Sequence, residues 1–246
     1  MAPLTPLEQQ QLHVAPSATF WHRVRFDLVV DHLRSRPTTA VLDVGAGSGL
    51  LGEHLAPTGV RYRFSESSPP LVTALTDRYG ATDLDDGGPI HSDVVVTVLD
   101  VIEHVEDDAA LLTSLAARMQ PGAGLVVTVP AMSWLFSSWD TDLGHHRRYG
   151  KRQLVALLDR SGFEVLEVGY LFPELVPPAI LRKLRRSTGE AADFPQLPRA
   201  VDRAGEAVGR TTARLRRWWP AGTSVVATAQ RTAAPIEQPP PRQTPS

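Results

Sequence analysis

The sequence contains no cysteine, which excludes disulfide bonds, thiolate nucleophiles and zinc–sulfur sites. It also has no apolar run near the ~20 residues that a membrane span needs. Its first ten residues, MAPLTPLEQQ, lack the basic segment and apolar core of a secretion signal, so we expect a cytoplasmic protein with no integral membrane part. The net charge of −2 gives no global attraction to nucleic acid, and we expect no nucleic-acid partner.

The 246 residues, 42% of them hydrophobic, are enough for one large domain with a substantial core. We expect this domain to span residues 17–230, after a flexible N-terminus at residues 1–16. Residues 231–246 are rich in proline and polar side chains, which predicts a disordered tail. Apolar strands alternate with helical periods, which predicts a doubly wound α/β sheet preceded by a helix over residues 17–35.

A short apolar strand, residues 40–44, runs into the sequence Gly45-Ala-Gly47-Ser-Gly49. Glycine lacks Cβ, so the chain can turn sharply there while its backbone N–H groups approach a ligand closely. This pattern predicts a nucleotide-like cofactor. The dinucleotide fingerprint requires G-x-G-x-x-G, and Leu50 stands where its third glycine should be, which disfavours NAD. The alternative is a glycine turn that serves packing alone.

An acidic residue, Glu66, follows the next expected strand, residues 60–65, and lies 21 positions after Gly45. A carboxylate at the tip of the second strand can accept hydrogen bonds from both ribose hydroxyls of a nucleotide. The alternative is a solvated loop carboxylate. The spacing favours the ribose contact.

A third feature is the apolar run from Asp93 to Val105, which contains the sequence LDVIEHV. Continuous β-branched strands of this kind are typical of a parallel sheet covered on both faces. A helix is expected over residues 109–119, and it ends at Pro121-Gly-Ala-Gly before the strand LVVTVP.

Taken in order, the glycine turn with Asp43 two residues before it, Glu66, LDVIEHV and the Pro121 turn resemble the motifs of class I S-adenosylmethionine (SAM)-dependent methyltransferases. The resemblance implies a Rossmann-like sheet of seven strands with the last one antiparallel, and SAM as the cofactor. The residues that it implies for cofactor binding are Asp43, Gly45, Ala46, Gly47, Gly49, Glu66, Asp83, Leu99, Asp100 and His104. Asp83 is the best-aligned candidate for a contact with adenine.

The segment after the fifth strand, GHHRRY at residues 144–149, resembles one found in a bacterial branch of these enzymes. Because ligands of open α/β sheets lie beyond the carboxyl ends of the strands, this segment is expected to meet the methyl acceptor. His145 and His146 are the candidate general bases. The expected substrate-binding residues here are Trp139, Asp140, Arg147 and Tyr149. The alternative is a structural cluster in which Arg148 and Tyr149 anchor the next helix through carboxylates such as Asp140 or Asp142.

We expect no metal, because no third ligand of suitable spacing accompanies the two histidines in the sequence.

An insertion at residues 171–221 separates the last two expected strands and is longer than a simple connection requires. It should contain helices of its own. Residues 171–220 carry ten basic and five acidic side chains together with apolar ones, which predicts a cap over an acceptor with an anionic group. Arg182 and Arg185 are the candidate contacts. The alternative is a helical pair that only covers the sheet edge.

The function expected from these features is SAM-dependent methyl transfer to an oxygen, nitrogen or carbon atom of a small molecule. One alternative is a SAM-binding protein that does not methylate, such as a cyclase or an accessory subunit. Another is a module that binds a membrane surface or a carrier protein through the basic segment 171–220.

Overall fold

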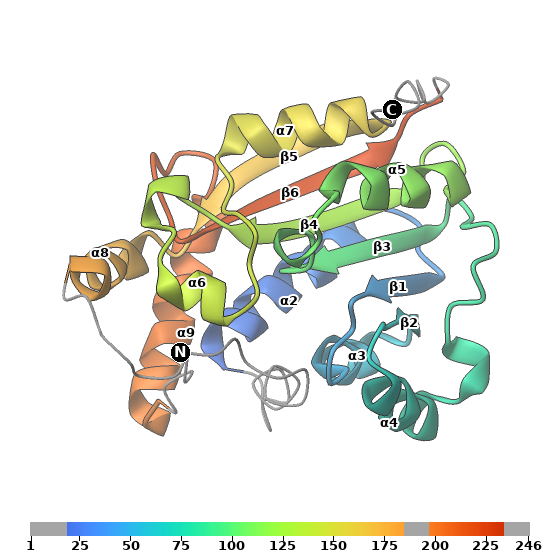
Figure 1. Cartoon of the computed structure of the whole chain (residues 1–246). Coiled ribbons are helices and arrows are strands. Elements are labelled where there is room, and N and C mark those ends of the chain that lie inside the picture. The colour runs from blue at the N-terminus through green and yellow to red at the C-terminus, as the bar shows by residue number, and fades with distance from the viewer. Residues whose placement is uncertain (1–18, 185–196, 234–246) are drawn as a thin grey trace.

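Six strands form one sheet in the computed structural model, which describes residues 19–184 and 197–233 (Figure 1). Their order is β2-β1-β3-β4-β6-β5. The strands are β1 (Ala40–Val44), β2 (Arg61–Ser65), β3 (Val94–Leu99), β4 (Gly124–Pro130), β5 (Phe163–Leu171) and β6 (Ser224–Arg231). β1 to β4 run parallel, and β6 is antiparallel to both β4 and β5.

The helices alternate with these strands, as the sequence predicts. They are α2 (Phe20–Arg34), α3 (Leu50–Leu55), α4 (Pro69–Tyr79), α5 (Asp108–Arg118), α6 (Ser138–Asp142), α7 (Lys151–Arg160), α8 (Val176–Leu184) and α9 (Arg199–Arg214). Within the described ranges, no helix has the length and apolarity needed to cross a bilayer. The predictions for residues 1–16 and for the tail beyond residue 233 lie outside these ranges.

The prediction of seven strands is wrong, because the described part of the chain has six. Residues 81–90 instead form a 3₁₀ turn at Ala81–Asp83 and two isolated bridges, one between Leu84 and Phe64 of β2 and one between Ile90 and Met119. The sequence between these bridges, DDGGP, consists of residue types that disfavour strands. The Asp85 carboxylate also forms an ion pair with Arg118 of α5, at 2.6 Å. The sheet therefore ends at β2.

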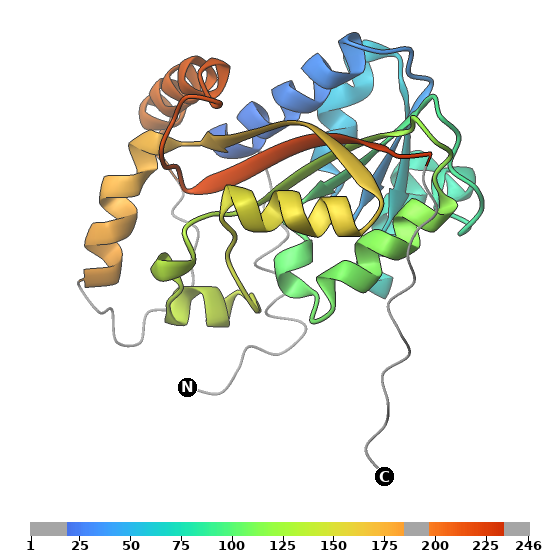
Figure 2. The ribbon, with the colours of Figure 1, turned by 90° about the horizontal axis from the view of Figure 1, so that it is seen from above.

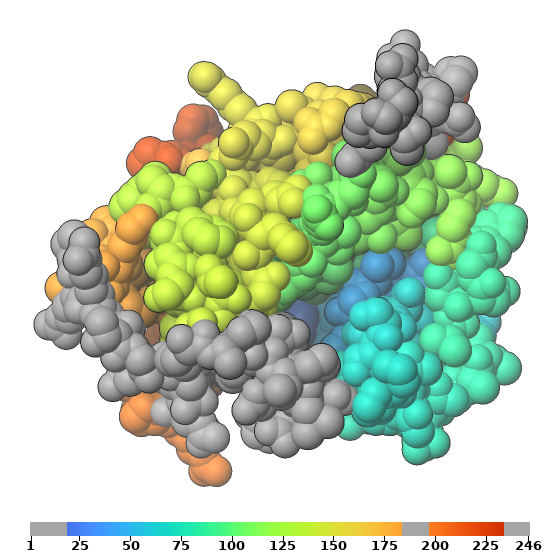
Figure 3. Space-filling view, viewed as in Figure 1, coloured from blue at the N-terminus to red at the C-terminus, as the bar shows by residue number. Residues whose placement is uncertain are grey.

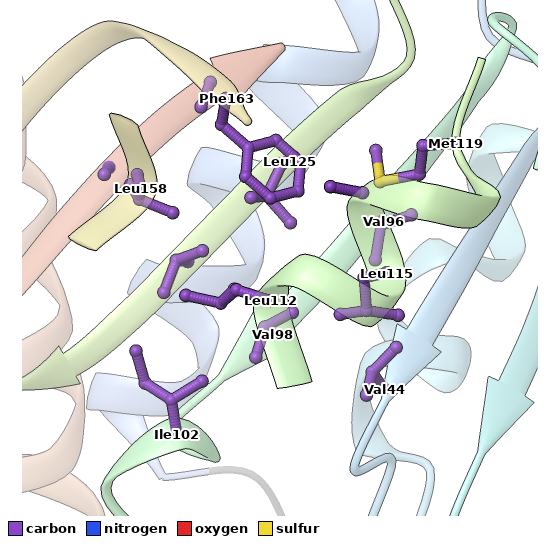
Figure 4. Close-up of a cluster of buried hydrophobic side chains, with 14 of the residues drawn as sticks. Val44, Val96, Val98, Ile102, Leu112, Leu115, Met119, Leu125, Leu158 and Phe163 are labelled. Carbon is purple, nitrogen blue, oxygen red and sulfur yellow. The ribbon is translucent and has the colours of Figure 1, made fainter. Parts of the chain in front are cut away.

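Helices cover both faces of the sheet (Figure 2). α2 and α3 pack on one face and α5 and α7 on the other, so side chains of the central strands are buried on both sides. In β3, Val95 packs on the α2 side, whereas Val96 and Val98 face α5 (Figure 4). This two-sided burial explains the unbroken apolar run of this strand.

The insertion forms helices α8 and α9, which have different neighbours (Figures 1 and 2). α9 packs along α2, where Arg23 lies 2.6 Å from each of Asp202 and Glu206. α8 lies beside the chain that follows β4, and the Lys183 ammonium donates a hydrogen bond to the carbonyl of Phe136 at 3.2 Å. Of these two described helices, α8 therefore contacts the segment that carries the candidate acceptor residues.

Candidate active site

The glycine turn joins β1 to α3 in a backbone conformation that favours glycine. Gly45, Gly47 and Gly49 have φ angles of +72°, +56° and +77°. A Cβ on Gly45 would lie 2.6 Å from Val101, so this glycine lets the loop after β3 approach. A Cβ on Gly47 would meet no atom within 4 Å. Gly47 therefore presents its backbone to open space, as a cofactor cradle requires.

Glu66, which directly follows β2, is hydrogen-bonded to this turn. Its Oε2 accepts a hydrogen bond from the Gly47 N–H at 2.8 Å, and its Oε1 accepts from the N–H groups of Ser67 and Ser68 at 2.7 and 2.9 Å. The Ser67 hydroxyl also donates to Oε1, at 3.3 Å. Each carboxylate oxygen has about two acceptor positions, so Oε2, with one described donor, retains capacity for a further one. The structure thus brings Glu66 and the glycine turn together, as the sequence predicts.

Asp43 lies beneath the turn and is buried. Its two oxygens accept hydrogen bonds from Thr97 at 2.7 Å and from Tyr62 at 2.9 Å. Burial raises the pKa of Asp43 to about 6, an effect that the charge of Glu66 increases and these two hydrogen bonds oppose. Asp43 thus ties β1 to β2 and β3 directly below the glycine turn.

β3 ends at Leu99, and the loop after it begins with Asp100, which has a φ of +54°. Such a value is uncommon for a residue with a side chain and marks a constrained position. The Asp100 carboxylate accepts a hydrogen bond from Thr128 at 3.1 Å and pairs with Arg25 of α2, also at 3.1 Å. The N-terminal helix therefore reaches the carboxyl edge of the sheet through Arg25.

The predicted adenine contact, Asp83, has a different partner. Its carboxylate accepts a hydrogen bond from Arg61 at 2.6 Å. Arg61 begins β2, whereas Glu66 follows the end of that strand. The described contacts of Asp83 therefore lie toward the opposite end of β2 from the glycine turn.

The segment after β4 is organised around the buried carboxylate of Asp140 in α6. This carboxylate accepts hydrogen bonds from His145 Nδ1 at 3.0 Å and from Arg148 Nε at 2.6 Å. Burial alone would raise the pKa of Asp140, but the hydrogen bonds from His145 and Arg148 hold it below its ordinary value. Asp140 is therefore an ionised acceptor, and His145 must keep its proton on Nδ1.

This segment lies against the loop after β3 (Figure 3). His104 and His145 contact each other there. Their rings pack edge to face with centroids 4.7 Å apart. Glu103 lies in the same place, and each of the three residues offers a potential ligand atom within 4.8 Å of the other two. His146 is exposed, and its backbone N–H donates to the Glu103 carbonyl at 2.7 Å.

Two predicted substrate-binding residues are engaged by one carboxylate of α5. The Tyr149 hydroxyl donates to Asp108 Oδ2 at 2.8 Å, and Arg147 lies 3.0 Å from the same oxygen. Tyr149 is buried, and burial together with this hydrogen bond raises its pKa. These contacts anchor the loop to α5.

The remaining pair, Trp139 and Arg182, joins α6 to α8. The Arg182 guanidinium lies over the Trp139 ring, 4.5 Å from its centroid, in the geometry of a cation–π contact. Arg185, the second expected contact from the insertion, lies outside the described residues.

Residues 20–168, more than half of the chain, match the family described as methyltransferase domain. The chain belongs to this methyltransferase family. The match covers α2 to most of β5, so the α8–α9 insertion and β6 lie beyond it.

The curated relatives agree with this assignment. The chain is 28% identical over 155 residues to a probable S-adenosylmethionine-dependent methyltransferase of Mycolicibacterium smegmatis, covering 59% of this chain and 60% of that protein. It is 29% identical over 116 residues to a ubiquinone biosynthesis O-methyltransferase of Xanthomonas campestris pv. campestris, covering 43% of this chain and 48% of that protein. The chain thus matches about half to three-fifths of the length of these curated relatives.

The solved structure of the cyclase SpnF has a TM-score of 0.56 and 19% identity, covering 87% of this chain and 82% of that one. At this identity the likeness shows the fold alone. The family and the relatives support both the predicted class of enzyme, a methyltransferase, and the predicted cofactor, SAM.

The pairing of Arg148 with Asp140 is the one that the structural alternative named. Two residues of the candidate site were missed by sequence reasoning: Arg25 and Glu103. Glu103 stands in LDVIEHV, and an acid among apolar residues just after a strand is a signal that could have found it. Arg25 carries no such signal, since an arginine in a helix is usually solvated. Its role depends on Asp100, which only the fold brings to it.

Proposed function

We propose that this protein transfers the methyl group of SAM to a small-molecule acceptor at the carboxyl edge of β1, β3 and β4. The observation that carries the proposal is the contact between Glu66 and Gly47, because it joins the two strongest cofactor motifs into one cradle. In this proposal the open backbone at Gly47 faces the cofactor, and Oε2 of Glu66 uses its remaining acceptor position for a ribose hydroxyl.

The acceptor is proposed to lie between the loop after β3 and the segment after β4. Methyl transfer from a sulfonium needs mainly alignment of the acceptor and exclusion of water, with activation where the acceptor carries a proton. Of the two candidate histidines, His145 is the better placed. Its Nδ1 donates to the buried Asp140, so its Nε2 lone pair remains to act on the acceptor or on a group bound to it. His146 is exposed and makes its described contact through the backbone.

α8 is the part of the insertion that supports the capping proposal. It brings Arg182 to Trp139, so a cation and an aromatic face lie together near the segment after β4. These groups suit an acceptor with an apolar body and an anionic group.

The test is transfer of labelled methyl from SAM to components of a metabolite extract, followed by isolation of the labelled product. The proposal expects a labelled small molecule whose formation is inhibited by S-adenosylhomocysteine. A chain that binds SAM but labels nothing in extracts from several sources would instead favour a non-methylating SAM-binding protein. Capture of membrane vesicles or a carrier protein without SAM binding would favour a binding module.

A further inference from the structure

Glu103 is a buried acid, and burying a carboxyl group that has no partner costs free energy. Its side chain is 1% exposed, and neither carboxylate oxygen accepts a hydrogen bond from the residues that the structure describes. Buried carboxylates are normally paired, hydrogen-bonded or bound to a metal.

The two arginines near Glu103 are each paired with another carboxylate. Arg25 is paired with Asp100 at 3.1 Å, and Arg148 with Asp140 at 2.6 Å. Each guanidinium therefore has a carboxylate of its own, and Glu103 is the third carboxylate of the group. A cation bound to Glu103 would supply the positive partner that this third carboxylate lacks among the described residues.

Two imidazoles lie next to this carboxylate. The ligand atoms offered by Glu103, His104 and His145 all lie within 4.8 Å of one another. Two ligands of one zinc ion, each ~2.1 Å from the metal, are separated by up to about 4 Å. Small side-chain movements would therefore bring all three onto one ion.

The orientation of His145 is that of a metal ligand. Metal-binding histidines usually donate their other ring N–H to a carboxylate, which fixes the ring and its tautomer. Asp140 accepts this hydrogen bond from Nδ1 at 3.0 Å and is itself held by Arg148. Nε2 is then the nitrogen left to bind a metal.

We propose that Glu103, His104 and His145 bind one divalent metal ion of the zinc, cobalt or manganese type. Two imidazoles and one carboxylate suit these ions, and three protein ligands leave at least one coordination position open. The prediction of no metal rested on the lack of a third ligand near His145 and His146 in the sequence. The fold supplies Glu103 and His104 from the loop after β3.

The proposed role of the metal rests on the proposed function. A hydroxyl of the acceptor would occupy the open position, where the ion lowers its pKa and its proton leaves to water. The resulting oxyanion would form the new C–O bond with the SAM methyl carbon as the C–S bond breaks and its electron pair stays on sulfur. His145 would then act through the metal, and the acceptor atom would be oxygen.

The test is equilibrium dialysis of the purified full-length protein against Zn²⁺ after removal of metals with a chelator, with Co²⁺ absorption as a second probe. The variants are Glu103→Gln, His145→Ala and Asp140→Asn. His91→Ala is the matched control, because His91 is exposed and precedes β3 at the opposite end of the sheet. SAM affinity and thermal unfolding are measured on the same samples, so that a lost metal site is separated from a lost fold.

We expect one Zn²⁺ per chain in the wild type and in His91→Ala. Binding should weaken at least tenfold in Glu103→Gln and His145→Ala, and about 10–100-fold in Asp140→Asn, while SAM affinity is retained. Absence of Zn²⁺ and Co²⁺ binding in the wild type, or equal binding in all variants, would overturn the proposal. A protein that binds zinc at this site but transfers no methyl group would retain the metal site and overturn the proposed function instead.

Discussion

The backbone N–H of Gly47 donates to the carboxylate of Glu66 over 2.8 Å, so the acid that follows β2 holds the turn that follows β1. The two residues are 19 positions apart in the sequence. Their contact places a fixed negative group beside an open stretch of backbone, which is the arrangement that a nucleoside cofactor requires.

Gly47→Val should abolish SAM binding while the protein stays folded. Gly59→Val is a matched control, because Gly59 also has a positive φ, +73°, and a Cβ there would likewise meet no atom within 4 Å. Both substitutions impose similar backbone strain, but only the one at Gly47 fills the approach of the cofactor. Calorimetric titration with SAM measures the difference. Equal affinity in the two variants would show that the turn does not face the cofactor.

His145→Ala should lower kcat about 10²–10⁴-fold, whereas His146→Ala should have little effect. His145 is held by Asp140 and lies against His104, while His146 is exposed. The measurement is kcat across pH 6–9, with SAM affinity as the control for folding. Wild-type kcat in both variants would make the segment structural and leave alignment alone to carry the reaction.

Arg182→Glu should raise KM for the acceptor several-fold, make it less sensitive to salt and leave SAM affinity unchanged. The change removes the guanidinium that lies over Trp139. Arg160→Glu is the control, since it makes the same charge change at an exposed position at the end of α7. If the two variants share the wild-type KM at low salt, α8 does not contact the acceptor.

Protonation of His32 should lower the free energy of unfolding as the pH falls. Burial, and after it the charge of Arg36, lowers the pKa of His32 to about 4 from 6.5. Between these values the unfolded chain binds a proton that the folded protein does not, so stability falls as pH decreases from 6.5 toward 4. The whole shift corresponds to roughly 3 kcal/mol.

Denaturant unfolding of wild type and His32→Leu at several pH values measures this effect. The difference between the two proteins should change by that amount in favour of the variant between pH 7 and pH 4, and acid-sensitive groups shared by both proteins cancel. His91→Leu, at an exposed position, is the control. A difference that does not vary with pH would contradict the assignment.

The strands, the glycine turn and Glu66 could be predicted because they depend on local features. The strand over residues 40–44 and the end of the next strand at residue 65 agree with β1 and β2. In contrast, residues 81–90 have weak strand character, and their structure depends on Asp85 reaching Arg118 of a distant helix. The sequence-based count of seven strands followed the resemblance and failed there.

The acceptor side of the site was less predictable for a related reason. The sequence indicates the histidines and arginines of residues 144–149, but not which of them face solvent, a carboxylate or each other. Asp140 is five positions from His145, whereas Glu103 and His104 come from a loop about 40 positions earlier. The two segments meet only because β3 and β4 are neighbours in the sheet.

The proposed function depends above all on SAM binding at the glycine turn, with Glu66 as the ribose contact. Calorimetric titration of SAM into the wild type, Glu66→Ala and Glu53→Ala measures this binding, and Glu53 is the control because it is an exposed acid in neighbouring α3. We expect one SAM per chain in the wild type and in Glu53→Ala. Glu66→Ala should lose about 2–4 kcal/mol of binding free energy. Native affinity in Glu66→Ala, or no SAM binding by the wild type, would contradict this assignment.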